Sequence, residues 1–144
     1  MKTVQVFTPE RKFRVFEKKI KNWAGRALKA MEREKSAVEI YLIGDKQMRF
    51  LNKKFCGKNK STDVLSFKEP KNFPHPEDQL SHLGEIYLNI PYIKKETGEN
   101  NTHYSMLITQ LLVHGLLHLL GFRHRKKRDR IKMEKKEKFI LARL

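Results

Sequence analysis

Three histidines in one apolar segment have the spacing of a metal site. His114 and His118 are four residues apart, so on a helix their side chains lie on one face, within reach of a single ion. Gly121 follows three residues later, and a glycine there can end the helix in a left-handed conformation, so that His124 folds back as a third ligand. Three neutral imidazoles with a fourth position left open are typical of a catalytic zinc site, although nickel, cobalt or copper would also bind such a set.

The full pattern separates metal binding from ordinary packing. A histidine on an apolar helix is more often a hydrogen-bonded core residue than a ligand, but His-x-x-x-His-x-x-Gly-x-x-His has the spacing of the metzincin zinc proteases. Those proteases carry a glutamate directly after the first histidine as general base, and Gly115 stands there in this chain. Peptide hydrolysis by that route is therefore disfavoured. A bound zinc would still lower the pKa of its water towards about 7 and stabilise negative charge on an attacked oxygen.

A surplus of positive charge indicates a polyanionic partner. The 144 residues include 32 Lys and Arg against 16 Asp and Glu, a formal net charge of +16. Residues 123–138 contribute ten basic and three acidic side chains and begin beside His124. A charge run is usually a solvated helix face, and charged surfaces are also enriched in heat-adapted proteins, but neither explains a two-to-one excess of one sign. Joined to zinc chemistry, the charge favours a phosphodiester substrate in nucleic acid.

Cysteine content and hydropathy predict a cytoplasmic protein with no membrane association. Cys56 is the single cysteine, so it cannot form an intramolecular disulfide. The first residues lack a basic head followed by a long apolar run. The leucine-rich residues 106–122 include polar side chains and are short for a membrane span, so a buried helix of a soluble domain is the better interpretation.

The elements that position the histidines follow from apolar periodicity. Four strands are expected, at residues 2–7, 38–43, 63–67 and 84–90. About five helices are expected, over residues 10–34, from about 45 to 57, just after 91, from caps at 100–102 with apolar residues from 106 to 120, and from about 129. Residues 68–83 predict a loop, and the apolar helix at 106–120 belongs in the middle of the domain. The irregular alternation of strands and helices, without a glycine-rich nucleotide loop, predicts an α+β fold in a single domain over residues 1–144.

Two segments carry a family resemblance. Residues 114–124 resemble the His-Gly-x-Leu-His-Leu-x-Gly-aromatic-Asp-His signature of the YbeY family, and residues 51–67 resemble its second signature. Residues 84–86 and 133–137 more weakly resemble its Gly-Asp-Ile strand and the start of its last helix. The family comprises bacterial metal-dependent endoribonucleases linked to ribosomal RNA maturation and ribosome quality control.

The resemblance implies a mixed four-stranded sheet and one zinc per chain, held by His114, His118 and His124. It further implies a zinc-dependent, single-strand-specific endoribonuclease that takes part in 16S rRNA 3′-end maturation and ribosome quality control, with single-stranded RNA, ribosomal RNA and the ribosome as partners. Two alternatives stay open: a metalloprotease-like zinc hydrolase, and a ribosome-associated RNA-binding factor whose metal is mainly structural.

Two positions depart from the family signatures. The arginine before the glycine of the second signature is Cys56 here, and the aspartate before the third histidine is Arg123. Either the enzyme is weaker, or other basic residues contact the substrate phosphate. The candidates are Lys54, Lys58, Lys60, Arg125 and Lys126. Cys56 is itself a small apolar residue or a fourth metal ligand.

No general base is assigned by the sequence. Asp63 and Glu85 are candidates because they lie in the matched segments. Alternatively, these two carboxylates cap a helix or orient a metal-binding histidine.

Overall fold

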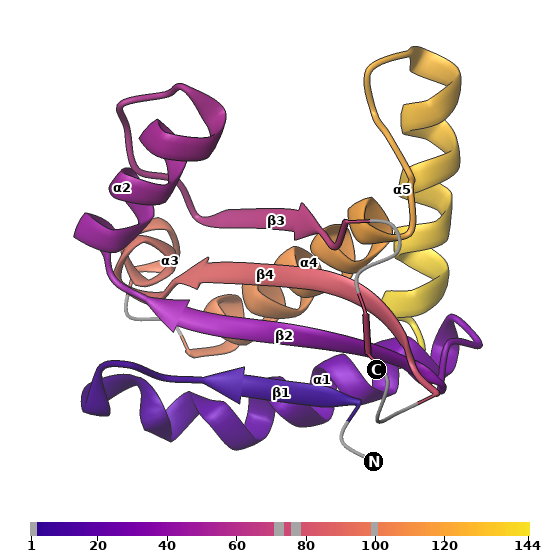
Figure 1. Ribbon diagram of the computed structural model, residues 1–144, viewed down its shortest axis with the longest axis horizontal. Coiled ribbons are helices and arrows are strands. Elements are labelled where there is room, and N and C mark those ends of the chain that lie inside the picture. The colour runs from indigo at the N-terminus through magenta and orange to yellow at the C-terminus, as the bar shows by residue number, and fades with distance from the viewer. Residues whose placement is uncertain (1–2, 71–73, 76–78, 99–100) are drawn as a thin grey trace.

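A four-stranded mixed sheet organises the chain in the computed structural model, which describes residues 3–70, 74–75, 79–98 and 101–144. The strands are β1 (Val4–Phe7), β2 (Ser36–Ile43), β3 (Val64–Lys68) and β4 (Ser81–Asn89). Their order in the sheet is β1-β2-β4-β3 (Figure 1). Strands β1 and β4 pair with β2 in parallel, and β3 pairs with β4 antiparallel, so the expected mixed four-stranded sheet is confirmed.

The described residues form five α-helices, which lie behind the sheet and at its two ends (Figure 1). They are α1 (Glu17–Ala30), α2 (Asp45–Cys56), α3 (Ile90–Thr97), α4 (Asn101–Leu119) and α5 (Lys127–Leu141). Helices α1 and α4 lie behind the sheet in Figure 1, and α5 packs against α4. The α+β class and the number of α-helices agree with the sequence prediction. Among the described residues, no helix is both long and apolar enough to cross a membrane.

The first helix and the start of β4 differ most from the sequence prediction. The expected helix over residues 10–34 is a 3-10 helix, η1 (Arg11–Phe16), followed by α1, and the helix is over before Glu32, whose φ is 57°. Strand β4 begins at Ser81, within the expected loop, because its first residues pair with the start of β2 across a bulge. Residues 71–73 and 76–78 of that loop, and residue 2 of the first expected strand, lie outside the described residues.

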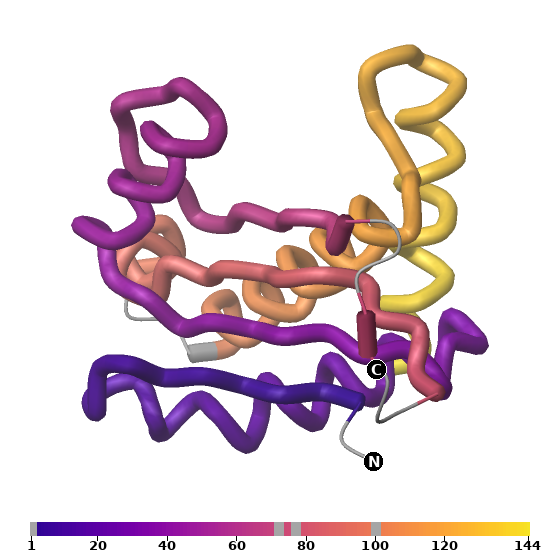
Figure 2. Tube along the Cα trace, viewed as in Figure 1, coloured from indigo at the N-terminus to yellow at the C-terminus, as the bar shows by residue number. Residues whose placement is uncertain are grey.

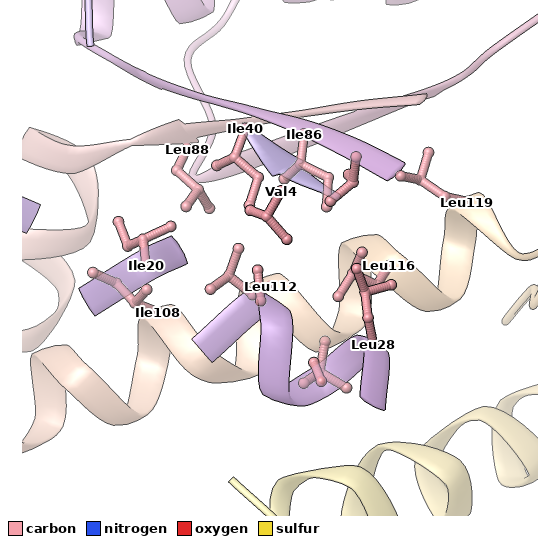
Figure 3. Close-up of a cluster of buried hydrophobic side chains, with 14 of the residues drawn as sticks. Val4, Ile20, Leu28, Ile40, Ile86, Leu88, Ile108, Leu112, Leu116 and Leu119 are labelled. Carbon is pink, nitrogen blue, oxygen red and sulfur yellow. The ribbon is translucent and has the colours of Figure 1, made fainter. Parts of the chain in front are cut away.

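The core lies between the sheet and the two helices behind it, and this explains why α4 is apolar on most sides. Helix α4 contacts α1, α3, α5, β3 and β4. Figure 3 shows side chains of the sheet facing those of α1 and α4: Val4, Ile40, Ile86 and Leu88 from the strands, Ile20 and Leu28 from α1, and Ile108, Leu112, Leu116 and Leu119 from α4. The helix predicted to carry the histidines is therefore fixed on several sides by buried apolar contacts.

Candidate metal centre

The three histidines meet at the C-terminal end of α4. The Nε2 atoms of His114 and His118 are 3.0 Å apart. The ring of His124 lies 5.6 Å from that of His114 and 5.0 Å from that of His118, measured between centroids. One nitrogen from each ring lies within 4.8 Å of the others. His114 and His118 are half-buried and His124 is exposed, so the group could hold one metal ion at the protein surface.

A glycine turn returns the chain towards the helix. Gly121 has φ 98°, in the left-handed region expected from the sequence. The Gly121 N–H donates to the His118 carbonyl at 3.0 Å, and the Phe122 N–H donates to the Leu117 carbonyl at 3.0 Å. These two bonds form a Schellman cap, with Phe122 packed against the core after the glycine. The cap brings His124 beside the two helical histidines, and Figure 2 traces the chain onward to α5.

Hydrogen bonds at Nδ1 orient two of the rings. His114 Nδ1 donates to Glu137 Oε1 of α5 at 2.8 Å, and His118 Nδ1 donates to the Phe122 carbonyl at 3.1 Å. Because a carboxylate and a carbonyl oxygen only accept, the proton of each neutral ring is on Nδ1 and the lone pair is on Nε2. Metal-binding histidines in proteins usually have such a partner on their second nitrogen.

The donor atoms fit a zinc ion. Two lone pairs that face each other at 3.0 Å repel unless a cation or a proton lies between them. Tetrahedral zinc with Zn–N bonds of about 2.0 Å places its nitrogens about 3.3 Å apart, close to the separation found here. Burial, with His114 and His124 nearby, lowers the pKa of His118 and favours the neutral ring that binds metals.

Two cavities give access to the histidines. One, of about 410 Å³, is lined by β3 residues including Lys68, together with His114 and His118. The other, of about 550 Å³, is lined by Asp63, His114 and the α5 residue Glu137, among others. Lys68 was missed by the sequence analysis, although it directly follows the second matched segment. A metal at this centre would therefore have an open side, with the ammonium group of Lys68 and the carboxylates of Asp63 and Glu137 near it.

Gly115 separates this centre from a zinc protease. A Cβ atom at this position would lie 3.1 Å from Cδ1 of Ile86 on β4, so Gly115 faces the sheet. Any side chain larger than hydrogen at this position would therefore crowd Ile86. The glycine at the position of the protease base thus suits the close packing of α4 on β4.

Comparison with known proteins identifies the family. The sequence model of the family described as "Endoribonuclease YbeY" matches residues 5–144. The chain belongs to the YbeY family. Among curated YbeY endoribonucleases, that of Neorickettsia sennetsu is 33% identical over 88% of this chain and 89% of its own length. The one from Wolbachia is 42% identical over 76% of this chain and 70% of its own length. The one from Desulforamulus reducens is 36% identical over 74% of this chain and 71% of its own length.

A solved structure has the same fold. The solution structure of TM1509 from Thermotoga maritima matches with a TM-score of 0.59 at 22% identity, over 96% of this chain and 89% of that one. The topology that places the YbeY signature histidines at the end of α4 is thus found in a second protein.

The lysines predicted to bind substrate occupy a different part of the fold from Arg125 and Lys126. Lys54 is on α2, and Lys58 and Lys60 are in the loop between α2 and β3. None of the three lines either cavity beside the histidines, as far as the described residues define them. Arg125 and Lys126 are exposed and directly follow His124, before α5. Arg125 and Lys126 are therefore next to the metal centre in the chain, whereas Lys54, Lys58 and Lys60 lie on α2 and the loop that follows it.

Polar contacts of two buried asparagines, Asn52 and Asn89, hold the α2–β3 loop in place. Asn52 Nδ2 donates to the Lys60 carbonyl at 2.9 Å. The fully buried Asn89 donates from Nδ2 to Asp45 Oδ1 at 2.8 Å, and Ser61 Oγ donates to the same oxygen at 2.6 Å. These two donors hold the pKa of the Asp45 carboxyl below its usual value. The sequence analysis missed Asn89, which anchors the loop that carries two of the candidate lysines.

The two candidate bases are on opposite faces of the sheet. Asp63 lines a cavity with His114. Glu85 neighbours Ile86, which packs under Gly115, so alternation along β4 directs Glu85 to the face away from α4. There it accepts a hydrogen bond from Tyr87 and lines a separate cavity. Cys56 is exposed at the end of α2, outside the histidine group, so the structure does not support it as a fourth ligand.

Proposed function

We propose that this protein is a zinc-dependent, single-strand-specific endoribonuclease. The observation that carries the proposal is the convergence of three histidines, two of them oriented by hydrogen bonds at Nδ1, at an open surface site in a chain of the YbeY family. Family membership supports cleavage of RNA. The donor set, with three imidazoles and no thiolate among the grouped residues, supports zinc as the metal.

The residues around the site suit phosphodiester cleavage. Zinc held by His114, His118 and His124 would supply a Lewis acid and a water of lowered pKa. Lys68, which lines the same cavity as His114 and His118, is placed to stabilise negative charge on a bound phosphate. Asp63 is the candidate base that shares a cavity with His114 and is assigned proton transfer in this proposal.

The RNA backbone is proposed to follow the basic segment that begins at His124. Arg125 and Lys126 are exposed and adjacent to the metal centre, so they would contact the phosphates next to the cleaved bond. Lys54, Lys58 and Lys60 are proposed to hold a more distant part of a single strand. The anchored α2–β3 loop supports that role, because a fixed loop loses less conformational entropy on binding.

The biological substrate proposed is ribosomal RNA. Maturation of the 16S rRNA 3′ end and ribosome quality control follow from the family resemblance, as does the ribosome as a partner. The cytoplasmic location stays a prediction from the sequence.

An RNA cleavage assay tests the proposal. We expect purified protein to cut a labelled single-stranded RNA but not the same RNA in a duplex, to lose activity with a chelator and to regain it with zinc. His114→Ala should reduce cleavage by at least about 100-fold. His103→Ala on the same helix, outside the histidine group, is the matched control and should be active. RNA cleavage that survives the chelator would refute the proposal. RNA binding without cleavage would refute it in favour of the RNA-binding factor. Cleavage of casein would refute it in favour of the protease.

A further inference from the structure

The sheet face opposite α4 carries a cavity that the nuclease mechanism does not use. It has a volume of about 720 Å³ and is lined by residues of all four strands and of α2. Apart from Lys68, it shares no lining residue with the two cavities that His114 lines. This cavity is therefore distinct from the two beside His114, with Lys68 at the boundary between them.

A second group of metal-ligating side chains lies at this cavity. Glu69 directly follows β3, His75 lies in the β3–β4 connection and His82 is on β4. Their donor atoms lie within 4.8 Å of one another, and all three residues are half-buried. His75 Nε2 is 2.8 Å from Glu69 Oε1, and the His75 and His82 rings stack at 3.4 Å with planes 6° apart. Segments that are separate along the chain thus supply one carboxylate and two imidazoles at one point.

The charge of the surroundings suits a cation and not RNA. Glu39 and Glu85 also line this cavity, and they are direct neighbours across the parallel β2–β4 pair. Lys68 is the one Lys or Arg among its described lining residues. In a chain with net charge +16, three carboxylates around one cavity form a local acidic surface, which repels phosphate and attracts metal ions.

We propose that Glu69, His75 and His82 form a second metal site, for a divalent transition metal of the zinc class. Two imidazoles and one carboxylate are a known zinc ligand set, and imidazole selects zinc-class metals over magnesium or calcium. A metal lies in the plane of each imidazole that binds it, so binding opens the parallel His75–His82 stack by rotation of at least one ring. The bound metal joins the β3–β4 connection to β4.

Metal counting tests this site. Zinc alone is titrated into metal-free protein against a chromophoric chelator. We expect two zinc ions per chain for the wild type, one for His75→Ala/His82→Ala and two for the control His103→Ala. Glu69→Gln, which keeps the shape of the side chain, should weaken the second site by at least about tenfold. One zinc per wild-type chain, or two in the His75→Ala/His82→Ala variant, would overturn the proposal.

Thermal unfolding gives an independent measurement. In a His114→Ala/His118→Ala variant, saturating zinc should raise the melting temperature by about 5 °C, because a ligand that binds only the folded state stabilises it. Adding His82→Ala should abolish the rise. No rise in the first variant, or an equal rise in both, would show that zinc does not bind at Glu69, His75 and His82.

Discussion

Replacement of Glu137 should weaken metal binding without unfolding the protein. Its carboxylate accepts the Nδ1–H of His114 at 2.8 Å, and the two side chains are 24% and 35% exposed. Loss of an orienting partner of this kind typically costs 10–100-fold in metal affinity. Glu137→Gln keeps a neutral acceptor and should cost about tenfold, or about 1.4 kcal/mol. Glu137→Ala removes the acceptor and should cost up to about 100-fold.

A zinc competition titration measures these affinities. Glu134→Gln is the matched control, because Glu134 lies one turn earlier on α5, lines the same cavity as His114 and carries the same charge. Its zinc affinity should change by less than about threefold, since exposed charges are screened by solvent. The melting temperatures of the metal-free variants should differ little from that of the wild type, because a partly exposed ion pair contributes at most about 1 kcal/mol to the free energy of unfolding. Equal losses of affinity for Glu134→Gln and Glu137→Gln would refute the argument, because the bond to His114 would then have no specific role.

Four further changes give separate tests. Gly115→Ala should lower the melting temperature by about 3 °C in thermal unfolding, because its Cβ would crowd Ile86 and helix propensity offsets only part of that cost. Gly121→Ala should cost about 1–2 kcal/mol in urea unfolding and also reduce zinc affinity, because its φ of 98° disfavours a side chain and the turn places His124. Asp63→Asn should lower the RNA cleavage rate by about 100-fold, whereas the exposed control Glu34→Gln should be unaffected; equal rates would exclude Asp63 as the base. Neutralising four basic residues should reduce the slope of log K for RNA binding against log salt concentration by up to about 2.8, with zinc content unchanged. Loss of zinc would contradict the role of these residues in phosphate binding. These residues are Arg125, Lys126, Lys127 and Arg128.

The histidine group could be predicted because its geometry is local. Helical spacing places His114 and His118 on one face, and a left-handed glycine reverses the chain within three residues. Both depend on backbone geometry within eleven residues. The expected strands and helices were found for a similar reason, since apolar periodicity follows from which face of each element is buried.

The surroundings of the site depend on tertiary packing and were less accessible. Glu137 is 23 residues from His114 in sequence, and only the packing of α5 on α4 brings them together. The face on which Glu85 lies could have been inferred from β4, because Ile86 and Leu88 are buried and alternate with Glu85 and Tyr87. Because Tyr87 is aromatic, the strand does not alternate simply between apolar and polar residues.

The lysine predictions were limited by loop geometry. Lys54, Lys58 and Lys60 lie in a segment matched to a family signature, but sequence proximity to a signature does not give the direction in which a loop leaves its helix. That direction is set by Asn52 and Asn89, whose buried amides bind groups of the loop. Asn52 lies in the segment matched to the family signature, but that match does not say which group its amide binds.

The two hydrogen bonds that orient the histidines differ in their vulnerability to mutation. The acceptor for His118 is the backbone carbonyl of Phe122, which every amino acid supplies, so no substitution at position 122 removes that group directly. The acceptor for His114 is the side chain of Glu137, which a single nucleotide change can eliminate. Of these two positions, 137 should therefore be the one where substitution lowers metal affinity, while position 122 tolerates side chains that pack against the core and keep the backbone N–H of the cap.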